Sequence, residues 1–375
     1  MMTVNNVTAS LMILFAVIIV GDTIGKVEFC GIKFDKAAIL FVGVVAGLVL
    51  SLAVGEDELL YLEQLNLNMK LVSSMGTSFF VSAIGIECGY LLNNHFNLKN
   101  IKYIFCGVFM SACGFVITTL IALINKDADI SLLYGVMCGV LTTTPGLSSL
   151  CEINGISSEV ATVGYGIAYI LGIATIMIFI QSIIRKRTSE KIDSHKSKNI
   201  DNRNCEKGLL VVIAVALLGK MIGNIEISKF HISIGESCGM LIVGLLIGFI
   251  LQKNKIKSCE ASFNMMRNLG LMLFLSASGI SAALLNLKSI DYTYIILGFI
   301  IVLPTLIIGY IITKFVFKEE KTDVATVISG GVTSTPSMGM LMHRYSNIDT
   351  YKYSLTYIGA LLAMMFLMKL VVFIA

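Results

Sequence analysis

Two short segments combine hydroxyl side chains with a proline inside otherwise apolar sequence. They read "GVLTTTPGLSSL" at residues 139–150 and "GGVTSTPSMGML" at residues 330–341, and they hold two of the three prolines in the chain. Proline lacks an N–H group and clashes with the carbonyl four residues earlier, so Pro145 frees the carbonyl of Leu141 and Pro336 frees that of Val332. Each segment therefore predicts a broken helix.

A new helix is expected to begin at each proline, because proline suits the first helical turn and the preceding threonine, Thr144 or Thr335, is a good N-cap. The first free amides, from Gly146 and from Ser337 onward, would carry about half a positive charge, which attracts an anionic group. The flanking hydroxyls can satisfy the freed carbonyls or reach a ligand. We therefore predict a binding site for a small anion such as a compact dicarboxylate. Its expected residues are Thr142, Thr143, Thr144, Pro145, Gly146, Thr333, Ser334, Thr335, Pro336 and Ser337. The alternative is that the two bends only shape a helix.

Glu87 is an ionisable residue in the apolar stretch "SAIGIECGYLL" (82–92). A charge near the middle of a membrane span is costly and is usually functional. We expect Glu87 to act in ion or proton coupling or as the partner of a cation; the alternative is a position nearer the membrane interface. The sequence shows no Ser-His-Asp order, no phosphate loop and no metal-ligand spacing of cysteines, so we expect neither an enzyme nor a bound metal.

The elements that carry these residues are membrane-spanning helices. The 375 residues are 56% hydrophobic and 14% charged, with a mean hydropathy of +0.86, which is too apolar for a soluble fold. Long apolar stretches recur along the chain, and most can cross roughly 30 Å of hydrocarbon as helices. They lie at about 8–24, 36–54, 70–93, 101–125, 131–151, 158–184, 207–225, 234–252, 264–287, 291–315, 324–343 and 350–375. The expected fold class is an all-α integral membrane protein.

The two halves of the chain repeat each other. The first three matching blocks are "VGDTIGKVEF" (20–29) with "LGKMIGNIEI" (218–227), "VGVVAGLVL" (42–50) with "VGLLIGFIL" (243–251), and "GTSFFVSAIGI" (76–86) with "GLMLFLSASGI" (270–280). The two proline segments are the fourth pair, and such duplication is typical of secondary transporters. We expect a first membrane repeat over residues 1–184, a basic cytoplasmic linker over 185–207 and a second membrane repeat over 208–375.

The distribution of positive charge predicts how each half crosses the membrane. If all six segments of the first half cross, Lys26, Lys36 and Lys102 face away from the basic linker, against the positive-inside rule. If the proline segment enters and leaves on one side, each half crosses five times, these lysines become cytoplasmic, and Lys70 and Lys126 become external. An odd number of crossings makes the two repeats inverted relative to each other. The alternative is a kinked full span in each half, with parallel repeats.

These segments resemble a known family. "FFVSAIGIECGYLL" (79–92), "GYGIAYILGI" (164–173), "LFLSASGISAALL" (273–285) and the two proline segments are similar to the paired membrane duplication domains of the bacterial aspartate:alanine exchanger family. The resemblance implies exchange of small carboxylates such as aspartate, alanine or succinate, by an elevator-type or rocking movement. Larger members carry soluble regulatory domains between the halves, whereas only residues 185–207 occupy that place here.

We therefore expect a secondary active transporter that exchanges small carboxylates or acidic amino acids by alternating access. One alternative is a sodium-coupled symporter, in which Glu87 and the freed carbonyls would be the cation ligands; another is a passive, channel-like membrane protein. No cofactor is expected apart from the sodium of the first alternative. The expected partners are a small anionic substrate, the lipid bilayer and a second copy of the chain in a homodimer, with no nucleic acid. The expected location is the bacterial inner membrane.

Overall fold

A computed structural model describes most of the chain. The described residues are 2–29, 32–33, 36–53, 59–95, 97, 99–125, 127–184, 202–227, 232–233, 235–253, 260–284, 293–344 and 348–374. Residues 185–201 of the expected linker and Lys126 lie outside the described residues. Helix α8 begins at Asn202, so residues 202–207, which the sequence assigned to the linker, are helical.

The two halves contain the same elements in the same order. The first half forms α1 (Met2–Gly25), β1 (Glu28–Phe29), β2 (Ile32–Lys33), α2 (Ala37–Ala53), α3 (Leu59–His95), α4 (Ile101–Ile124), α5 (Ile130–Val140), α6 (Thr144–Cys151) and α7 (Ser158–Ile183). The second half forms α8 (Asn202–Gly223), β3 (Glu226–Ile227), β4 (Ile232–Ser233), α9 (Glu236–Lys253), α10 (Glu260–Leu284), α11 (Thr293–Ile311) with the π-helical end η2 (Ile312–Val316), α12 (Lys321–Gly331), α13 (Thr335–Arg344), α14 (Thr350–Lys369) and the 3₁₀ turn η3 (Leu370–Phe373). Each strand pair is a two-residue antiparallel ladder, so the fold is all-α apart from these turns.

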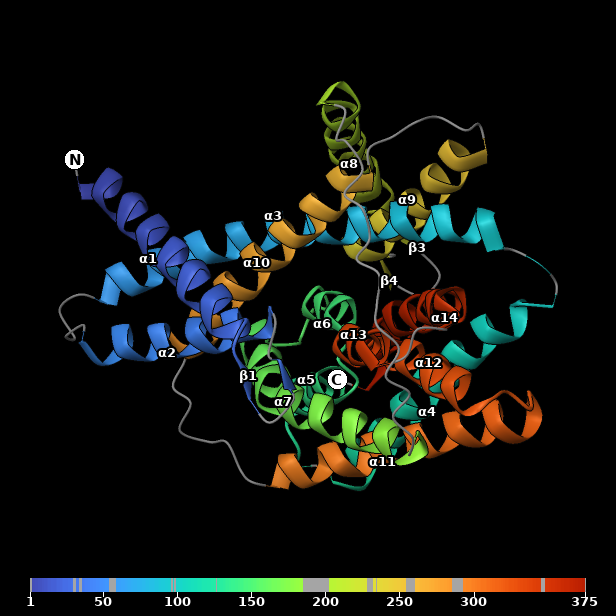
Figure 1. Cartoon of the computed structure of the whole chain (residues 1–375). Coiled ribbons are helices and arrows are strands. Elements are labelled where there is room, and N and C mark those ends of the chain that lie inside the picture. Colours follow the sequence, from blue (N-terminus) through green and yellow to red (C-terminus); the bar gives the residue numbers. More distant parts are fainter. Residues whose placement is uncertain are drawn as a thin grey trace.

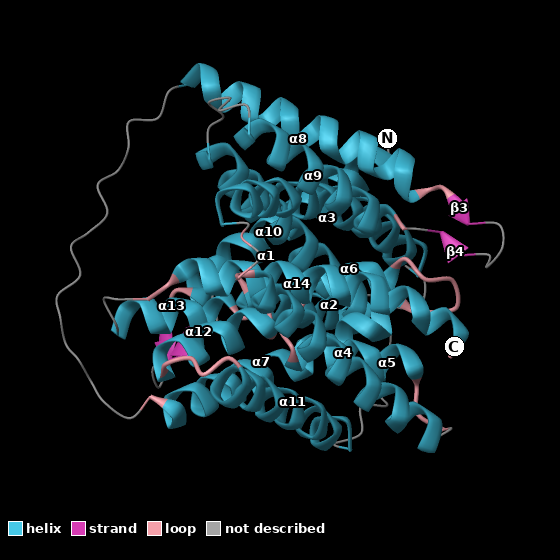
Figure 2. Ribbon diagram, turned by 90° about the vertical axis from the view of Figure 1, so that its right-hand side faces the viewer, coloured by secondary structure: helices cyan, strands magenta, loops and turns pink. Residues whose placement is uncertain are grey.

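The helices form two bundles, each built from both halves of the chain (Figures 1 and 2). We name the first the scaffold bundle; it contains α1, α2, α3, α8, α9 and α10. We name the second the hairpin bundle; it contains α4 to α7 and α11 to α14. Within the scaffold bundle the halves are interleaved, because α9 packs on α3 and α2 packs on α10.

The equivalent helices α3 and α10 cross each other at equivalent glycines. A Cβ atom on Gly76 would lie 2.7 Å from the carbonyl oxygen of Gly270, and one on Gly270 would lie 2.6 Å from that of Gly76. Glu87 pairs with Arg267 on one side of this crossing, and Ser73 is hydrogen-bonded to Ser278 on the other. The two helices therefore run antiparallel. Antiparallel equivalent helices confirm that the repeats are inverted.

Two further glycine contacts are also related by the symmetry of the repeats. Gly43 of α2 packs against Gly279 of α10, and its repeat equivalent Gly244 of α9 packs against Gly85 of α3. Small residues allow such close approach of helix backbones. These glycines therefore serve packing within one chain.

Both proline segments are re-entrant hairpins. The amide of Ser157, which precedes α7, donates to the hydroxyl of Ser131 at the start of α5, so the chain returns to the side from which it entered. In the second half, Lys352 at the start of α14 pairs with Asp323 at the start of α12. This confirms the hairpin prediction and excludes the kinked full span.

Within the described residues, seven helices are long and apolar enough to cross a membrane: those at Val7–Gly25, Tyr61–Leu92, Ile101–Ile124, Ser158–Ile183, Glu236–Lys253, Thr293–Val316 and Tyr351–Phe373. Each of the five equivalent helix pairs outside the hairpins contains at least one of them, which indicates five crossings per half. The outer faces expose large apolar side chains such as Phe15, Phe109 and Leu217, as expected of a surface in contact with lipid. The chain is thus a multi-pass membrane protein.

Candidate functional site

The tips of the two hairpins are hydrogen-bonded to each other. The hydroxyl of Thr142 donates to the carbonyl oxygen of Val332 at 2.8 Å, and the hydroxyl of Thr333 donates to that of Leu141 at 3.2 Å. These are the two carbonyls that the prolines free from their own helices. Since all four residues are buried, each tip completes the hydrogen bonding of the other.

Thr142 and Thr333 also share an unusual backbone conformation, with φ values of 53° and 52°. The left-handed region costs a non-glycine residue roughly 1–2 kcal/mol, because its Cβ crowds the following carbonyl. Each of the two reciprocal hydrogen bonds stabilises the tips by roughly 0.5–1.5 kcal/mol, which offsets part of this cost. The sharp turn at each tip therefore depends on the presence of the other tip.

The helix starts lie one residue earlier than predicted. Thr144 is already helical, and the N-cap of α6 is Thr143, whose hydroxyl oxygen accepts from the amide of Gly146 at 3.2 Å. A Cβ atom at Gly146 would lie 2.9 Å from that oxygen, so a glycine suits this cap. The prediction of Thr144 and Thr335 as N-caps was wrong, because the turn at Thr142 leaves Thr143 with the non-helical backbone that a cap requires.

The predicted rows of free amides are also largely absent. In the second hairpin the amide of Ser337 donates to the hydroxyl oxygen of Ser334 at 3.4 Å, as Gly146 does to Thr143 in the first. Within the described part of the chain, the amides of Thr144 and Thr335 are the ones that remain without a hydrogen-bond partner at the tips. Each half-helix thus offers one amide at its start.

A cavity of about 560 Å³ lies between the hairpin tips and the scaffold bundle. Five of the ten predicted hairpin residues line it: Thr142, Thr144, Pro145, Thr333 and Thr335. The other five, Thr143, Gly146, Ser334, Pro336 and Ser337, are not among the lining residues, and the side chains of Thr143 and Ser334 cap the half-helices instead. The structure brings both hairpins to one cavity but turns only part of each tip toward it.

Glu87 lines the same cavity, where it forms an ion pair with Arg267 of α10. Arg267 also donates to the side-chain oxygen of Asn264 at 2.8 Å. Arg267 is a site residue that sequence reasoning missed. The sequence contained one signal for it. The positions equivalent to Glu87 and Arg267 in the other repeat are Ser281 and Ser73, which are uncharged, so both members of the ion pair break the repeat symmetry. Of the roles predicted for Glu87, the structure shows the partner of a cation.

Tyrosines from α7 and α14 also line the cavity. The hydroxyl of Tyr165 is hydrogen-bonded to that of Thr144 at 2.8 Å, and the rings of Tyr353 and Tyr357 stack with centroids 5.6 Å apart. The hydroxyl of Tyr353 is buried without a hydrogen-bond partner among the described residues. A buried polar group without a partner is costly, so this hydroxyl is suited to meet a bound polar solute.

Charged groups at the two ends of the helices identify two sides of the molecule. Glu159 lies in the first turn of α7, and this helix ends next to the linker in the sequence, so Glu159 and its ion-pair partner Lys70 lie on the side away from the linker. Lys369 at the end of α14 is paired with Glu152 on that same side. Lys352 at the start of α14 therefore marks the linker side. The cavity reaches Lys36 and Arg267, toward the ends of helices that face the linker side.

One family model matches both halves of the chain. It is Asp-Al_Ex, described as Predicted Permease Membrane Region, and it matches residues 13–185 and again residues 210–373. The two matches leave out little more than the linker and cover all the residues of the cavity. The boundary between the two matches coincides with the boundary between the two structural repeats.

Proposed function

The chain belongs to the Asp-Al_Ex family of predicted permease membrane regions, and from this premise we propose that it is a secondary active transporter that exchanges small carboxylates or acidic amino acids. Aspartate, alanine and succinate are the solutes to test first. The observation that carries the proposal is the cavity in which two interlocked hairpin tips face the Arg267–Glu87 ion pair. The proposed location is the bacterial inner membrane.

Arg267 is the group best suited to bind a carboxylate of the solute. A guanidinium presents planar N–H donors that match the two oxygens of a carboxylate, and it stays charged at every physiological pH. A solute carboxylate at Arg267 would compete with Glu87 for the guanidinium. A solute that also carries an ammonium group offers Glu87 a new partner, so both charges of the pair stay compensated. This favours an amino acid over a dicarboxylate.

The hairpin tips would bind the part of the solute that lies away from Arg267. Thr144 and Thr335 line the cavity, no hydrogen-bond partner of their amides is found among the described residues, and the N-terminal ends of α6 and α13 favour negative charge there. The hydroxyl of Tyr353 adds a donor that has no other partner among the described residues. A compact solute would thus bridge the two bundles.

Relative movement of the two bundles would then carry the solute across the membrane. Inverted repeats allow two like halves to exchange conformations, so that one site opens first to one side and then to the other. The hairpins belong to one bundle and the ion pair to the other, which supports an elevator-type or rocking movement of the hairpin bundle against the scaffold bundle.

The tips do not favour the sodium-coupled alternative. The carbonyls of Leu141 and Val332, which were the expected cation ligands, accept hydrogen bonds from Thr333 and Thr142. Glu87, the third expected ligand, is paired with Arg267. A cation at this place would compete with all three partners.

Counterflow in reconstituted vesicles tests the proposal. Vesicles loaded with unlabelled aspartate are expected to take up labelled aspartate or alanine faster than empty vesicles, equally in sodium and in potassium buffer. Dependence on sodium would support symport, and flux that does not saturate would support a passive pore. Absence of trans-stimulation for aspartate, alanine and succinate alike would reject this group of solutes.

A further inference from the structure

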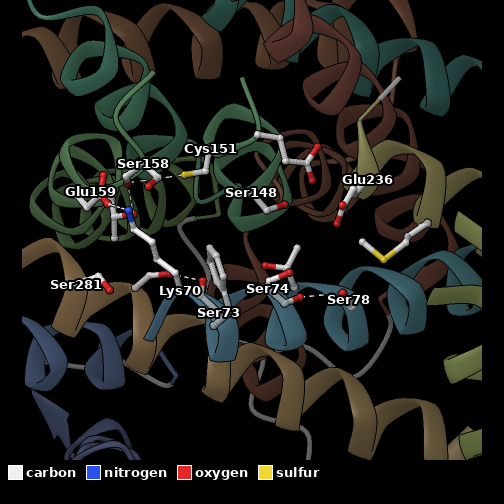
Figure 3. Close-up of a pocket in the computed structure, with 16 residues that line it drawn as sticks. Lys70, Ser73, Ser74, Ser78, Ser148, Cys151, Ser158, Glu159, Glu236 and Ser281 are labelled. Atoms are coloured by element: carbon white, nitrogen blue, oxygen red, sulfur yellow. Dashed lines mark hydrogen bonds and ion pairs between the residues drawn. The ribbon is translucent and has the colours of Figure 1, made fainter. Parts of the chain in front are cut away.

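We propose that a second, smaller cavity is the entry site for the same solute from the side away from the linker, and that contacts of Lys70, Glu159 and Glu152 keep it narrow in this conformation. This inference rests on the proposed transport function. The second cavity has a volume of about 180 Å³ and lies between α3 and α10 of the scaffold bundle and α6 and α7 of the hairpin bundle (Figure 3). Figure 3 shows its polar character, with serine hydroxyls from α3 facing the ends of α6 and α7.

The two cavities occupy equivalent places in the inverted repeats. Ser74 lines the smaller cavity and its repeat equivalent Asn268 lines the larger one, and the same holds for Phe274 and Phe80. Ser281 of the smaller cavity corresponds to Glu87 of the larger one. Since the repeats are inverted, equivalent places lie on opposite sides of the membrane. An exchange of conformations between the halves would therefore enlarge the smaller cavity and shrink the larger one.

The smaller cavity holds a polar group that a solute could satisfy. The hydroxyl of Ser281 is buried and has no hydrogen-bond partner among the described residues. Ser73 and Ser278 are hydrogen-bonded to each other nearby at 2.9 Å. The lining also contains three glutamates, Glu152, Glu159 and Glu236, and each of them is paired with a lysine. The serine hydroxyls are therefore the groups of this cavity that would contact a passing anion.

The first closing contact is an ion pair between the bundles. Lys70 of α3 lies 2.7 Å from the carboxylate of Glu159 in the first turn of α7, and the Glu159 side chain is only 11% exposed. In Figure 3 the Lys70 side chain reaches from α3 of the scaffold bundle to Glu159 of the hairpin bundle, where a dashed line marks the ion pair. The positions equivalent to Lys70 and Glu159 are Asn264 and Thr350, so an equivalent ion pair cannot form at the larger cavity.

The second closing contact joins the end of α6 to the start of α9. Glu152 accepts hydrogen bonds from both the amide and the hydroxyl of Ser237, with the amide nitrogen at 2.8 Å, while its other oxygen pairs with Lys369. Gly235 lies against this contact with a φ of +85°, and a Cβ atom there would lie 2.6 Å from Glu152. The positions equivalent to Glu152 and Ser237 are His343 and Lys36, two basic residues that cannot reproduce this contact. The contacts that keep this cavity narrow are therefore made by residues that differ between the two repeats.

Paired cysteine substitutions test this inference. Ser74→Cys and Asn268→Cys place thiols at equivalent positions of the two cavities, in a background from which Cys88 and Cys151 have been replaced by alanine. A charged, membrane-impermeant methanethiosulfonate is applied to either side of sealed vesicles, and the labelling rate is measured by mass spectrometry. We expect Asn268→Cys to react only from the linker side and Ser74→Cys to react only from the other side.

Adding Glu159→Gln to the same background is expected to raise the labelling rate of Ser74→Cys at least fivefold and to lower that of Asn268→Cys. The matched control is Glu236→Gln, because Glu236 also borders the smaller cavity but pairs with Lys220 inside the scaffold bundle. Because Lys220 also donates to the hydroxyl of Ser74 at 3.3 Å, Glu236→Gln should change the labelling of Ser74→Cys less than Glu159→Gln does, and it should leave that of Asn268→Cys unchanged. If Glu159→Gln impairs folding, the charge-swapped variant Lys70→Glu with Glu159→Lys should restore the parental rates.

The inference is overturned if Ser74→Cys reacts from the linker side, or if Glu159→Gln changes the labelling no more than Glu236→Gln does. Labelling needs no solute, so its outcome is separate from that of counterflow. A shift in labelling without counterflow of any carboxylate would retain the gate and reject the proposed solutes. Counterflow without a shift would retain the transporter and reject the gate.

Discussion

The hydroxyl of Thr142 lies 2.8 Å from the carbonyl oxygen of Val332, a carbonyl that Pro336 has released from its own helix. Thr333 makes the equivalent bond to Leu141, so each proline break is repaired by the other repeat. Broken backbone inside a membrane is tolerated only where protein or water satisfies it. Here protein satisfies it, and the two hairpins behave as one unit at the cavity.

We predict that Thr142→Val destabilises the protein by about 1–3 kcal/mol, because it leaves the buried carbonyl of Val332 without a donor. Thr142→Val with Thr333→Val should cost less than the sum of the two single changes, since the tips are coupled. Differential scanning fluorimetry in detergent measures both effects as shifts in melting temperature.

The matched control for this prediction is Thr118→Val. Thr118 is also buried and donates to the carbonyl of Gly114, but within a single unbroken helix. Thr118→Val should lower the melting temperature less than Thr142→Val does. Thr142→Ser, which keeps the hydroxyl, should stay near the parental value. Equal losses of melting temperature in Thr142→Val and Thr118→Val would mean that the bond between the tips contributes no more to stability than a hydrogen bond within one helix.

We predict that Arg267→Gln reduces counterflow at least tenfold, because it removes the carboxylate-binding cation of the cavity and leaves Glu87 without its charged partner. Arg267→Lys should recover only part of the activity, since an ammonium group lacks the planar donor pair of a guanidinium. Initial rates of labelled aspartate uptake measure both. Parental rates in Arg267→Gln would remove this residue from solute binding.

Tyr165→Phe is predicted to raise the KM for the solute severalfold, because Thr144 then loses the hydrogen bond that orients its hydroxyl at the cavity. The control is Tyr134→Phe, which removes a buried hydroxyl bonded to Thr119, away from the cavity. Concentration dependence of counterflow separates a change in KM from a change in maximal rate. A larger effect in Tyr134→Phe would indicate that general packing, and not the cavity, is being disturbed.

An acid titration is predicted to loosen the base of the second hairpin. Burial works to raise the pKa of Glu319, but hydrogen bonds from Lys102, Tyr103 and Lys352 outweigh it and lower the pKa from 4.5 to about 2. The carboxylate therefore contributes stability that is complete above pH 4.5 and is lost as the pH falls from about 4.5 toward about 2.

Melting temperatures of the detergent-solubilised protein between pH 2.5 and pH 6 would show this loss. Glu319→Gln should be less stable than the parent at pH 6 and should show a flatter decline over the acid range. Asp349→Asn is the control, because Asp349 is 55% exposed and pairs with Lys352 only at the surface. An unchanged acid profile in Glu319→Gln would show that other carboxylates govern the decline.

Much of the fold follows from local sequence patterns. The lengths of the apolar stretches, the paired glycines and the two prolines predicted the membrane helices, the inverted repeats and the hairpins. The positions of Lys36, Lys102 and Lys70 selected the re-entrant arrangement, and the ion pairs in the structure agree with it. The N-caps were misplaced by one residue because the left-handed turn at Thr142 depends on a contact with Val332, which no local pattern contains.

The sequence by itself determined where the helices break and which carbonyls become free, because proline acts on its own backbone within four residues. Only the tertiary structure decided what satisfies those carbonyls, which hydroxyls reach the cavity, and that Arg267 meets Glu87 from a helix 180 positions further along the chain. It also decided which of two equivalent cavities is the larger. Such choices depend on how two inverted halves pack, and packing joins residues that are distant in sequence but close in space.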